Sequence, residues 1–158
     1  MLAVSVCPLE SEHYFSVSYG RFADGHFAAE ITSNVDKGPD QYAGQVFRAA
    51  DGRAILISWI PGWRYQGYAE RDVGCMSVPR ELRVVDGKIV GYPVRELQHL
   101  LVDEDPSVIR TERGFTIPRE GREPLVYEGE IRDLKILRDG YVVEVFVNGG
   151  EEIYTALL

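Results

Sequence analysis

Aromatic side chains are the residues of this sequence best suited to binding a ligand. Trp63, Tyr65 and Tyr68 lie close together in a segment that comes after a Pro61-Gly62 turn. Flat aromatic faces pack well against the C–H surface of a sugar, and aromatic residues are also enriched at protein interfaces. We interpret this loop as a sugar platform or a protein contact, with simple capping of a hydrophobic core as the alternative.

The sequence contains no pattern typical of metal binding, of a nucleophilic serine or of a phosphate-binding loop. The histidines, His13, His26 and His99, are scattered without the spacing of metal ligands. No serine lies in a nucleophile-elbow pattern, and no glycine-rich loop precedes a helix. The sequence therefore predicts neither a metal site nor a cofactor. Glu81 and Arg80 are expected to form an ion pair at a junction, rather than Glu81 acting as an acid catalyst.

Composition is that of an ordinary globular protein. The 158 residues are 45% hydrophobic and 27% charged, which suits one core or two small ones. The formal net charge of -8 argues against nucleic acid or an anionic membrane as a partner. No apolar run is long enough to cross a bilayer, and the first residues do not resemble a signal peptide. Cys7 and Cys75 do not form a disulfide framework, so we expect free thiols and a cytoplasmic location.

Short strands joined by repeated Asp-Gly turns indicate an antiparallel all-β fold. Asp-Gly pairs favour hairpin turns because both positions of such turns require positive φ. A short helix is expected to begin at Pro93, since proline suits the first helical position. The segment 107–123 is polar and predicts only weak strands. Strands are predicted over residues 2–7, 13–20, 26–31, 41–48, 54–60, 80–85, 88–92, 130–138, 141–148 and 152–158.

Four segments of the chain form an ordered set: AILISWIPGW, PREL, DGKIVGYPVREL and VVEVFVNGGEEIYT. In order and spacing they resemble the second half of glycoside hydrolase family 32, which contains the invertases and other β-fructofuranosidases. Two upstream segments, YFSVSYGRFADGHFAAE and DKGPDQYAGQVF, also resemble family segments. The resemblance covers almost the whole chain but only part of the family's length.

The resemblance implies the last part of a β-propeller followed by a shortened β-sandwich. We therefore predict an all-β chain with about two propeller blades in residues 1–78, which also fits the four-strand spacing of blades. Residues 79–158 are predicted to form a sandwich-like antiparallel domain with one short helix. The family's sandwich is longer than the segment after Leu101 in this chain.

The same resemblance implies retaining hydrolysis of a glycosidic bond, which needs two carboxyl groups about 5–5.5 Å apart. In the family, the nucleophile, a transition-state stabiliser and the acid/base lie in Asn-Asp-Pro-Asn-Gly, Arg-Asp-Pro and Glu-Cys motifs. None of these motifs occurs in this sequence, and the Arg-Asp pairs at 71–72 and 132–133 are not followed by proline. No catalytic residue is therefore assigned.

The resemblance also implies a remnant sugar-binding surface. Trp59 matches a family tryptophan that lines the sugar pocket, and the alternative is a core tryptophan that ends a buried strand. Asp36 and Gln45 match positions near the substrate, where a carboxylate could accept hydrogen bonds from sugar hydroxyls. The alternative for these two is a loop aspartate and a solvated strand glutamine. Tyr42 is the fourth candidate, although it also suits the core of a propeller.

We therefore predict a truncated relative of the β-fructofuranosidases, without hydrolytic activity on its own, that keeps a surface for a fructose-containing sugar. Two alternatives remain open: the C-terminal half of a split sucrose or fructan hydrolase that needs a companion chain, and a structural module for protein interaction. Exposed strand edges recruit other strands, and a few blades cannot bury their faces alone. We therefore expect self-association, as a dimer or a higher oligomer, through the propeller-derived strands.

Overall fold

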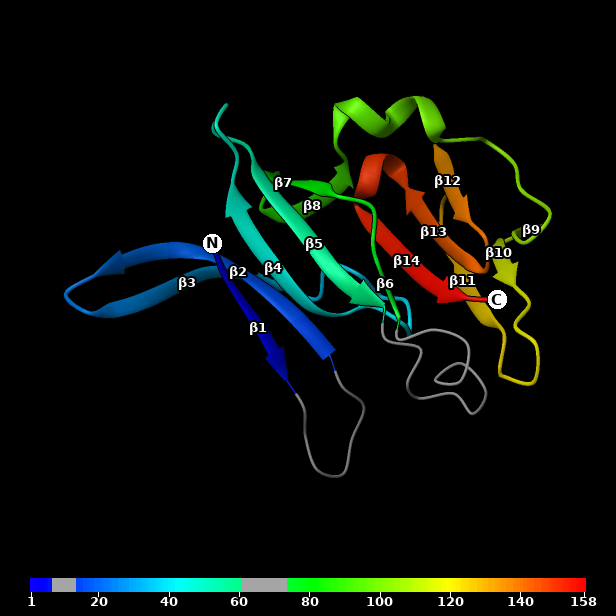
Figure 1. The fold of residues 1–158 in the computed structure, drawn as a ribbon, viewed down its shortest axis with the longest axis horizontal. Coiled ribbons are helices and arrows are strands. Elements are labelled where there is room, and N and C mark those ends of the chain that lie inside the picture. Colours follow the sequence, from blue (N-terminus) through cyan, green and yellow to red (C-terminus); the bar gives the residue numbers. More distant parts are fainter. Residues whose placement is uncertain (7–13, 61–73) are drawn as a thin grey trace.

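The computed structural model describes residues 1–6, 14–60 and 74–158 of the chain (Figure 1). Within these residues the fold is all-β, as predicted, with four antiparallel sheets and two short 3-10 helices. No helix in the described part is long and apolar enough to cross a membrane.

The first half of the chain forms two sheets, which we call the N-terminal sheet and the central sheet. The N-terminal sheet has the order β1 (Leu2–Val6), β2 (Tyr14–Ala23), β3 (His26–Ser33). The central sheet has the order β4 (Tyr42–Arg48), β5 (Ala54–Ile60), β7 (Arg80–Val85), β8 (Lys88–Pro93), and β6 (Cys75–Met76) also pairs with β5.

The second half forms two further sheets of three strands each. The outer sheet has the order β11 (Leu125–Glu128), β10 (Gly114–Ile117), β9 (Ile109–Thr111). The C-terminal sheet has the order β12 (Leu134–Asp139), β13 (Val142–Val147), β14 (Glu152–Leu157). The helices are η1 (Arg95–Leu100), after β8, and η2 (Asn148–Gly150), between β13 and β14.

Asp-Gly turns connect hairpins as the sequence predicts. Asp24 and Gly25 join β2 to β3 with φ values of 52° and 77°, and Asp86 and Gly87 join β7 to β8 with φ values of 48° and 74°. Positive φ at both central residues is the backbone of a turn whose twist matches that of the flanking strands. The second turn sets the register of β7 with β8 throughout, while the register of β2 with β3 shifts between Tyr19 and Gly20.

One face of the central sheet packs against both of its neighbours. Phe15 and Val17 of β2 share a buried cluster with Leu56 of β5, and the same cluster contains Phe146 and Ile153 of the C-terminal sheet. The central sheet thereby joins the two halves of the chain, which Figure 1 shows side by side along the longest axis.

Strand β13 is buried on both faces, because sheets cover it on both sides. Val143, Val145 and Val147 contribute to a cluster with the outer sheet. Phe146, on the opposite face, belongs to the cluster with the central sheet. The C-terminal and outer sheets thus pack on each other, and burial on both sides explains the apolar residues on both faces of residues 142–147. The sandwich-like domain as a whole stays a prediction.

Two features differ from the sequence-based expectations. The helix expected after Pro93 forms as η1, but as a 3-10 helix whose N-cap residue Val94 makes no side-chain hydrogen bond. Strands β7 and β8 were placed by the sequence after the domain boundary at residue 78. In the structure β7 pairs with β5 and β8 pairs with β7, so both extend the central sheet. The hydrogen-bonded sheet therefore continues past residue 78, while the domain boundary itself stays a prediction.

Gly38 permits the loop between β3 and β4 to lie directly on β14. A Cβ atom at this position would lie 2.1 Å from the carbonyl oxygen and 2.2 Å from the nitrogen of Thr155. We expect Gly38→Ala to lower the free energy of unfolding by at least ~1–3 kcal/mol, because the strand backbone cannot yield as a flexible side chain would. Urea denaturation followed by far-UV circular dichroism measures this.

Lys37→Ala is the matched control, because it changes the neighbouring residue of the same loop. Lys37 forms a partly exposed ion pair with Glu152 at 3.2 Å, and removing such a pair changes the free energy of unfolding by ~0–1 kcal/mol. Equal destabilisation by the two substitutions would show that the close approach at Gly38 is not important.

Candidate functional site

Three of the four candidate sugar-binding residues lie on one face of the central sheet. Tyr42 of β4 lies opposite Trp59 of β5, and Gln45 lies opposite Ile57. Directly opposed residues in antiparallel strands point to the same side, as do residues two apart in one strand. Met76 of β6 lies opposite Trp59 on its other side. We call the surface formed by these five residues the candidate face.

A β-bulge brings these side chains together. Tyr42 and Gln45 are three residues apart, so in a regular strand they would point to opposite sides of the sheet. The register of β4 against β5 shifts between these two residues, which inserts one extra residue and restores a common face. Ala43 has a φ of 48°, and a Cβ on Gly44 would lie 2.6 Å from the ring of Phe15. The bulge therefore needs a residue without a side chain at position 44.

The candidate face combines the groups that a sugar would need. Gln45 is exposed and offers an amide, Trp59 and Tyr42 are half-buried aromatic residues, and Met76 is 59% exposed. An indole and a phenol ring can stack on the C–H surface of a sugar, while the amide can donate and accept hydrogen bonds. The candidate face therefore carries the kinds of side chain that contact sugars in carbohydrate-binding sites.

Asp36, the fourth candidate, lies on the other side of the central sheet. Its side chain has no exposed surface, and its Oδ2 atom accepts hydrogen bonds from Nη1 of Arg80 at 2.7 Å and from Oγ1 of Thr155 at 2.5 Å. Oδ1 accepts hydrogen bonds from the backbone nitrogens of Gly38 and Thr155 at 2.8 and 3.0 Å. The sugar contact predicted for Asp36 stays a prediction, and the structure gives its carboxylate contacts within the chain instead.

Arg80 is at the centre of a buried ionic cluster that joins the two halves of the chain. In addition to its bond to Asp36, Arg80 donates hydrogen bonds from Nη2 to Oε2 of Glu144 at 2.5 Å and to Oγ1 of Thr155 at 2.7 Å. The guanidinium carbon also lies 5.4 Å from the ring centroid of Phe146. We call Asp36, Arg80, Glu144 and Thr155 the junction cluster.

The prediction that Arg80 pairs with Glu81 is wrong, because Arg80 forms its ion pairs with Asp36 and Glu144. Successive residues of a strand point to opposite faces, so Glu81 points away from the side on which Arg80 is buried. The carboxylates that pair with Arg80 come instead from the loop before β4 and from β13. A junction ion pair does form, but it joins residues that are far apart in the sequence.

Burial has opposite effects on the two kinds of charge in the junction cluster. Burial lowers the pKa of the Arg80 guanidinium, but the negative charges of Glu144 and Asp36 outweigh it, and the pKa lies above its ordinary value. Burial raises the pKa of the Glu144 carboxyl, against the opposing effects of Arg80 and of the hydrogen bond from the backbone nitrogen of Val78. The junction cluster therefore contains one cation and two carboxylates, so the positive charge of Arg80 is shared between two negative charges.

Sequence reasoning did not assign a role to Glu144 or Thr155. One signal was available: Glu144 is the single charged residue in VVEVFV, a run whose apolar residues point to both faces. A carboxylate in such a strand needs a buried partner. The aromatic loop with Trp63, Tyr65 and Tyr68, and also Cys7 and His13, lie outside the described residues.

Residues 1–93 match the family model described as the glycosyl hydrolases family 32 N-terminal domain. This chain belongs to glycosyl hydrolase family 32. The resemblance found in the sequence is thereby confirmed. The matched model is that of the family's N-terminal domain, which refines the prediction that the chain corresponds to the C-terminal part of the family.

Curated relatives in family 32 include sucrose-6-phosphate hydrolases. The one from Zymomonas mobilis is 34% identical over 123 residues, which are 76% of this chain and 23% of that protein. The one from Escherichia coli is 40% identical over 78 residues, which are 48% of this chain and 15% of that protein. The chain thus spans about a fifth of the length of the curated relatives that it matches.

Solved structures of family 32 share the fold. The sucrose-6-phosphate hydrolase of Lactobacillus gasseri aligns with a TM-score of 0.68 and 19% identity over 93% of this chain and 43% of that one. A mutant β-fructofuranosidase of Bombyx mori, in complex with sucrose, aligns with a TM-score of 0.71 and 18% identity over 95% of this chain and 43% of that one. The likeness confirms the all-β fold with propeller-derived sheets.

Replacing the central cation tests the junction cluster. We expect Arg80→Met to lower the free energy of unfolding by ~3–5 kcal/mol, because it leaves Asp36 and Glu144 as buried carboxylates without a cation. Chemical denaturation measures the loss. Arg95→Met is the matched control, since Arg95 is 69% exposed and its ion pairs with Asp51 and Glu96 lie at the surface.

The control substitution is expected to change the free energy of unfolding by less than ~1 kcal/mol. If Arg80→Met destabilised the chain no more than Arg95→Met does, the junction cluster would not hold the two halves together.

Proposed function

We propose that this chain provides a carbohydrate-binding face of the β-fructofuranosidase type and does not hydrolyse glycosidic bonds on its own. The observation that carries the first part is the bulge in β4, which sets Tyr42 and Gln45 on the same face as Trp59. A strand without the bulge would separate these side chains, so the face depends on a specific local distortion. Bulges of this kind are over-represented next to functional sites.

The proposed ligand is a sugar that contains a β-fructosyl unit. Membership in family 32 supports this class, as do relatives named sucrose-6-phosphate hydrolase and a structural neighbour solved in complex with sucrose. The chemistry of the face agrees with it, because stacking on aromatic rings combined with one or two amide hydrogen bonds suits a small neutral sugar. Sucrose and its 6-phosphate ester are the first ligands to test.

The second part of the proposal rests on the carboxylates that retaining hydrolysis requires. Two carboxyl groups must flank the glycosidic bond about 5–5.5 Å apart, one as nucleophile and one as acid/base. The 158 residues contain none of the three motifs in which the resembled family carries its catalytic carboxylates. The buried carboxylates of Asp36 and Glu144 are already bound to Arg80. We therefore propose that hydrolysis requires carboxylates from elsewhere.

Binding at the candidate face is tested by Trp59→Ala. We expect sucrose to quench tryptophan emission of the purified chain, and Trp59→Ala to abolish that response while the far-UV circular dichroism spectrum is kept. Val126→Ala serves as the control, because Val126 is 57% exposed on the outer sheet, away from the candidate face. A sugar response that persisted in Trp59→Ala would contradict the proposed binding face.

Hydrolysis is tested by release of fructose from sucrose and from sucrose 6-phosphate. We expect no release above background by the purified chain. Activity of the chain alone, abolished by one Asp→Asn or Glu→Gln substitution, would overturn this part of the proposal. Activity that appears only when a second polypeptide carrying the missing motifs is added would support the split-hydrolase alternative.

We also propose that the chain self-associates through the N-terminal sheet. Phe15 and Val17 of β2 point toward the central sheet, so Leu2, Val4 and Tyr14 lie on the opposite face, where they are 44%, 40% and 43% exposed. Leu2 and Val4 lie on β1, at the edge of the sheet, where exposed apolar residues favour association with a second copy. A dimer is the simplest assembly that covers this face.

Sedimentation velocity at several concentrations tests the proposed dimer. We expect the parent chain to sediment as a dimer, Val4→Glu as a monomer, and the control Val126→Glu as a dimer, because only Val4 lies on the N-terminal sheet. A monodisperse monomer of the parent chain across the concentration range would refute self-association.

A further inference from the structure

A row of buried polar side chains lies directly behind the candidate face. Nε2 of Gln41 donates a hydrogen bond to Oγ of Ser58 at 2.5 Å. The backbone nitrogen of Ser58 donates to Oγ of Ser77 at 3.0 Å, and the backbone nitrogen of Ser77 donates to the carbonyl oxygen of Ser58 at 2.8 Å. Each of the three residues is at most 6% exposed. We call Gln41, Ser58 and Ser77 the polar row.

Each residue of the polar row is adjacent in sequence to a residue of the candidate face. Gln41 precedes Tyr42, Ser58 precedes Trp59 and Ser77 comes after Met76. In an extended chain, adjacent residues point to opposite sides, so the polar row and the candidate face lie back to back across three segments of backbone. The distance between neighbouring segments therefore sets the spacing of side chains in the polar row and on the candidate face alike.

The hydrogen bonds of the polar row hold the three backbone segments together where the strand pairing of β4 and β6 with β5 ends. Strand β4 begins at Tyr42 and β6 ends at Met76, so Gln41 and Ser77 lie just outside these strands. At those positions the side chains of Gln41 and Ser77 hydrogen-bond to the hydroxyl and the backbone of Ser58. Buried hydrogen bonds of this kind are costly to leave unmade, so they define the spacing of the three segments closely.

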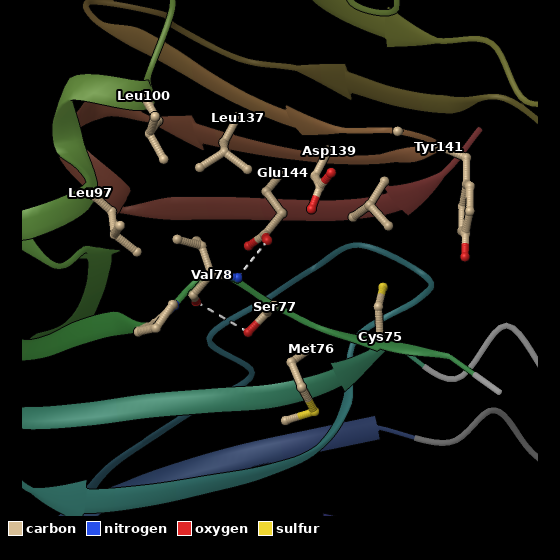
Figure 2. A pocket seen from close by; sticks show the side chains of 13 residues that line it. Cys75, Met76, Ser77, Val78, Leu97, Leu100, Leu137, Asp139, Tyr141 and Glu144 are labelled. Atoms are coloured by element: carbon tan, nitrogen blue, oxygen red, sulfur yellow. Dashed lines mark hydrogen bonds between the residues drawn. The ribbon is translucent and has the colours of Figure 1, made fainter. Parts of the chain in front are cut away.

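The polar row is also connected to the junction cluster, as Figure 2 shows. Oγ of Ser77 donates to the carbonyl oxygen of Val78 at 3.2 Å, and the backbone nitrogen of Val78 donates to Oε1 of Glu144 at 2.7 Å. Glu144 is held by Arg80 on its other oxygen. The segment that carries Met76 and Ser77 is therefore fixed at one end by β13 of the C-terminal sheet.

We propose that Ser58 and Ser77 are positioning residues for sugar binding. They fix the separation and orientation of Tyr42, Trp59 and Met76 from behind, and through Glu144 they tie the candidate face to the C-terminal sheet. This inference rests on the proposed function of the candidate face. It predicts that removing a hydroxyl with no access to the sugar changes both the environment of Trp59 and the affinity for sucrose.

The experiment uses Trp59 as the sole tryptophan, in the 158-residue chain carrying Trp63→Phe. Ser58→Ala is compared with Ser18→Ala, because Ser18 is also a buried serine with a hydroxyl hydrogen bond, shared with Oγ1 of Thr32 at 2.8 Å, but in the N-terminal sheet. Two quantities are measured at temperatures where circular dichroism shows each variant folded. They are the acrylamide quenching constant of Trp59 without sugar and the Kd for sucrose from fluorescence titration.

We expect Ser58→Ala to change the quenching constant of Trp59 and to raise the Kd for sucrose ~3- to 10-fold, the equivalent of one buried hydrogen bond. Ser18→Ala is expected to change neither quantity. A quenching constant that is the same in Ser58→Ala as in the parent overturns the inference, whether or not sucrose binds. A changed quenching constant in a chain whose parent binds no sucrose supports the positioning of Trp59 and overturns the proposed function instead.

Ser77→Ala keeps the inference testable if Ser58→Ala does not fold. It removes the acceptor for the backbone nitrogen of Ser58 and the bond to Val78, but leaves the pair of Gln41 and Ser58 in place. We expect the same direction of change in both quantities. Parent-like quenching in Ser77→Ala would overturn the role of the polar row.

Discussion

The ion pairs of Arg80 hold this molecule together. A buried guanidinium with two carboxylates connects the loop before β4, strand β7 and strand β13, and the hydroxyl of Thr155 adds β14. Buried charges are costly to leave unpaired, so separating any one of the four segments from the others would be unfavourable. The junction cluster therefore links the central sheet to the C-terminal sheet, and apolar residues such as Phe146 also pack between the two sheets.

The two faces of the central sheet serve different purposes. One face contains Leu56, Arg80 and the contacts to both neighbouring sheets, while the other contains Trp59 with Tyr42 and Gln45. The bulge at residues 43 and 44 belongs to both, because it turns Tyr42 toward the candidate face and lets Gly44 rest against Phe15. The same backbone irregularity thus fits the packing between sheets and the arrangement of the proposed ligand contacts.

Local sequence patterns predicted most of the strands, but they did not predict contacts between residues that are far apart in the sequence. Asp-Gly turns and alternation located the hairpins, since these signals depend on neighbouring residues. Strands β9 and β10 of the outer sheet were predicted only weakly, because residues 107–123 are polar apart from a few positions such as Phe115 and Ile117, which are fully buried. Strand β11 (Leu125–Glu128) was not predicted. Asp36 was placed near a ligand by resemblance, but its partner Arg80 is 44 residues away, and no local pattern records such a contact. The bulge was equally hidden, because a one-residue register shift leaves no periodic signal.

The separation of the junction residues along the chain has a consequence for synthesis on the ribosome. Arg80 leaves the exit tunnel 64 residues before Glu144. At ~5–20 residues per second this delay is on the order of several seconds, during which Arg80 can pair with Asp36 but not yet with Glu144. The central sheet therefore obtains its second buried ion pair only after β13 has been synthesised.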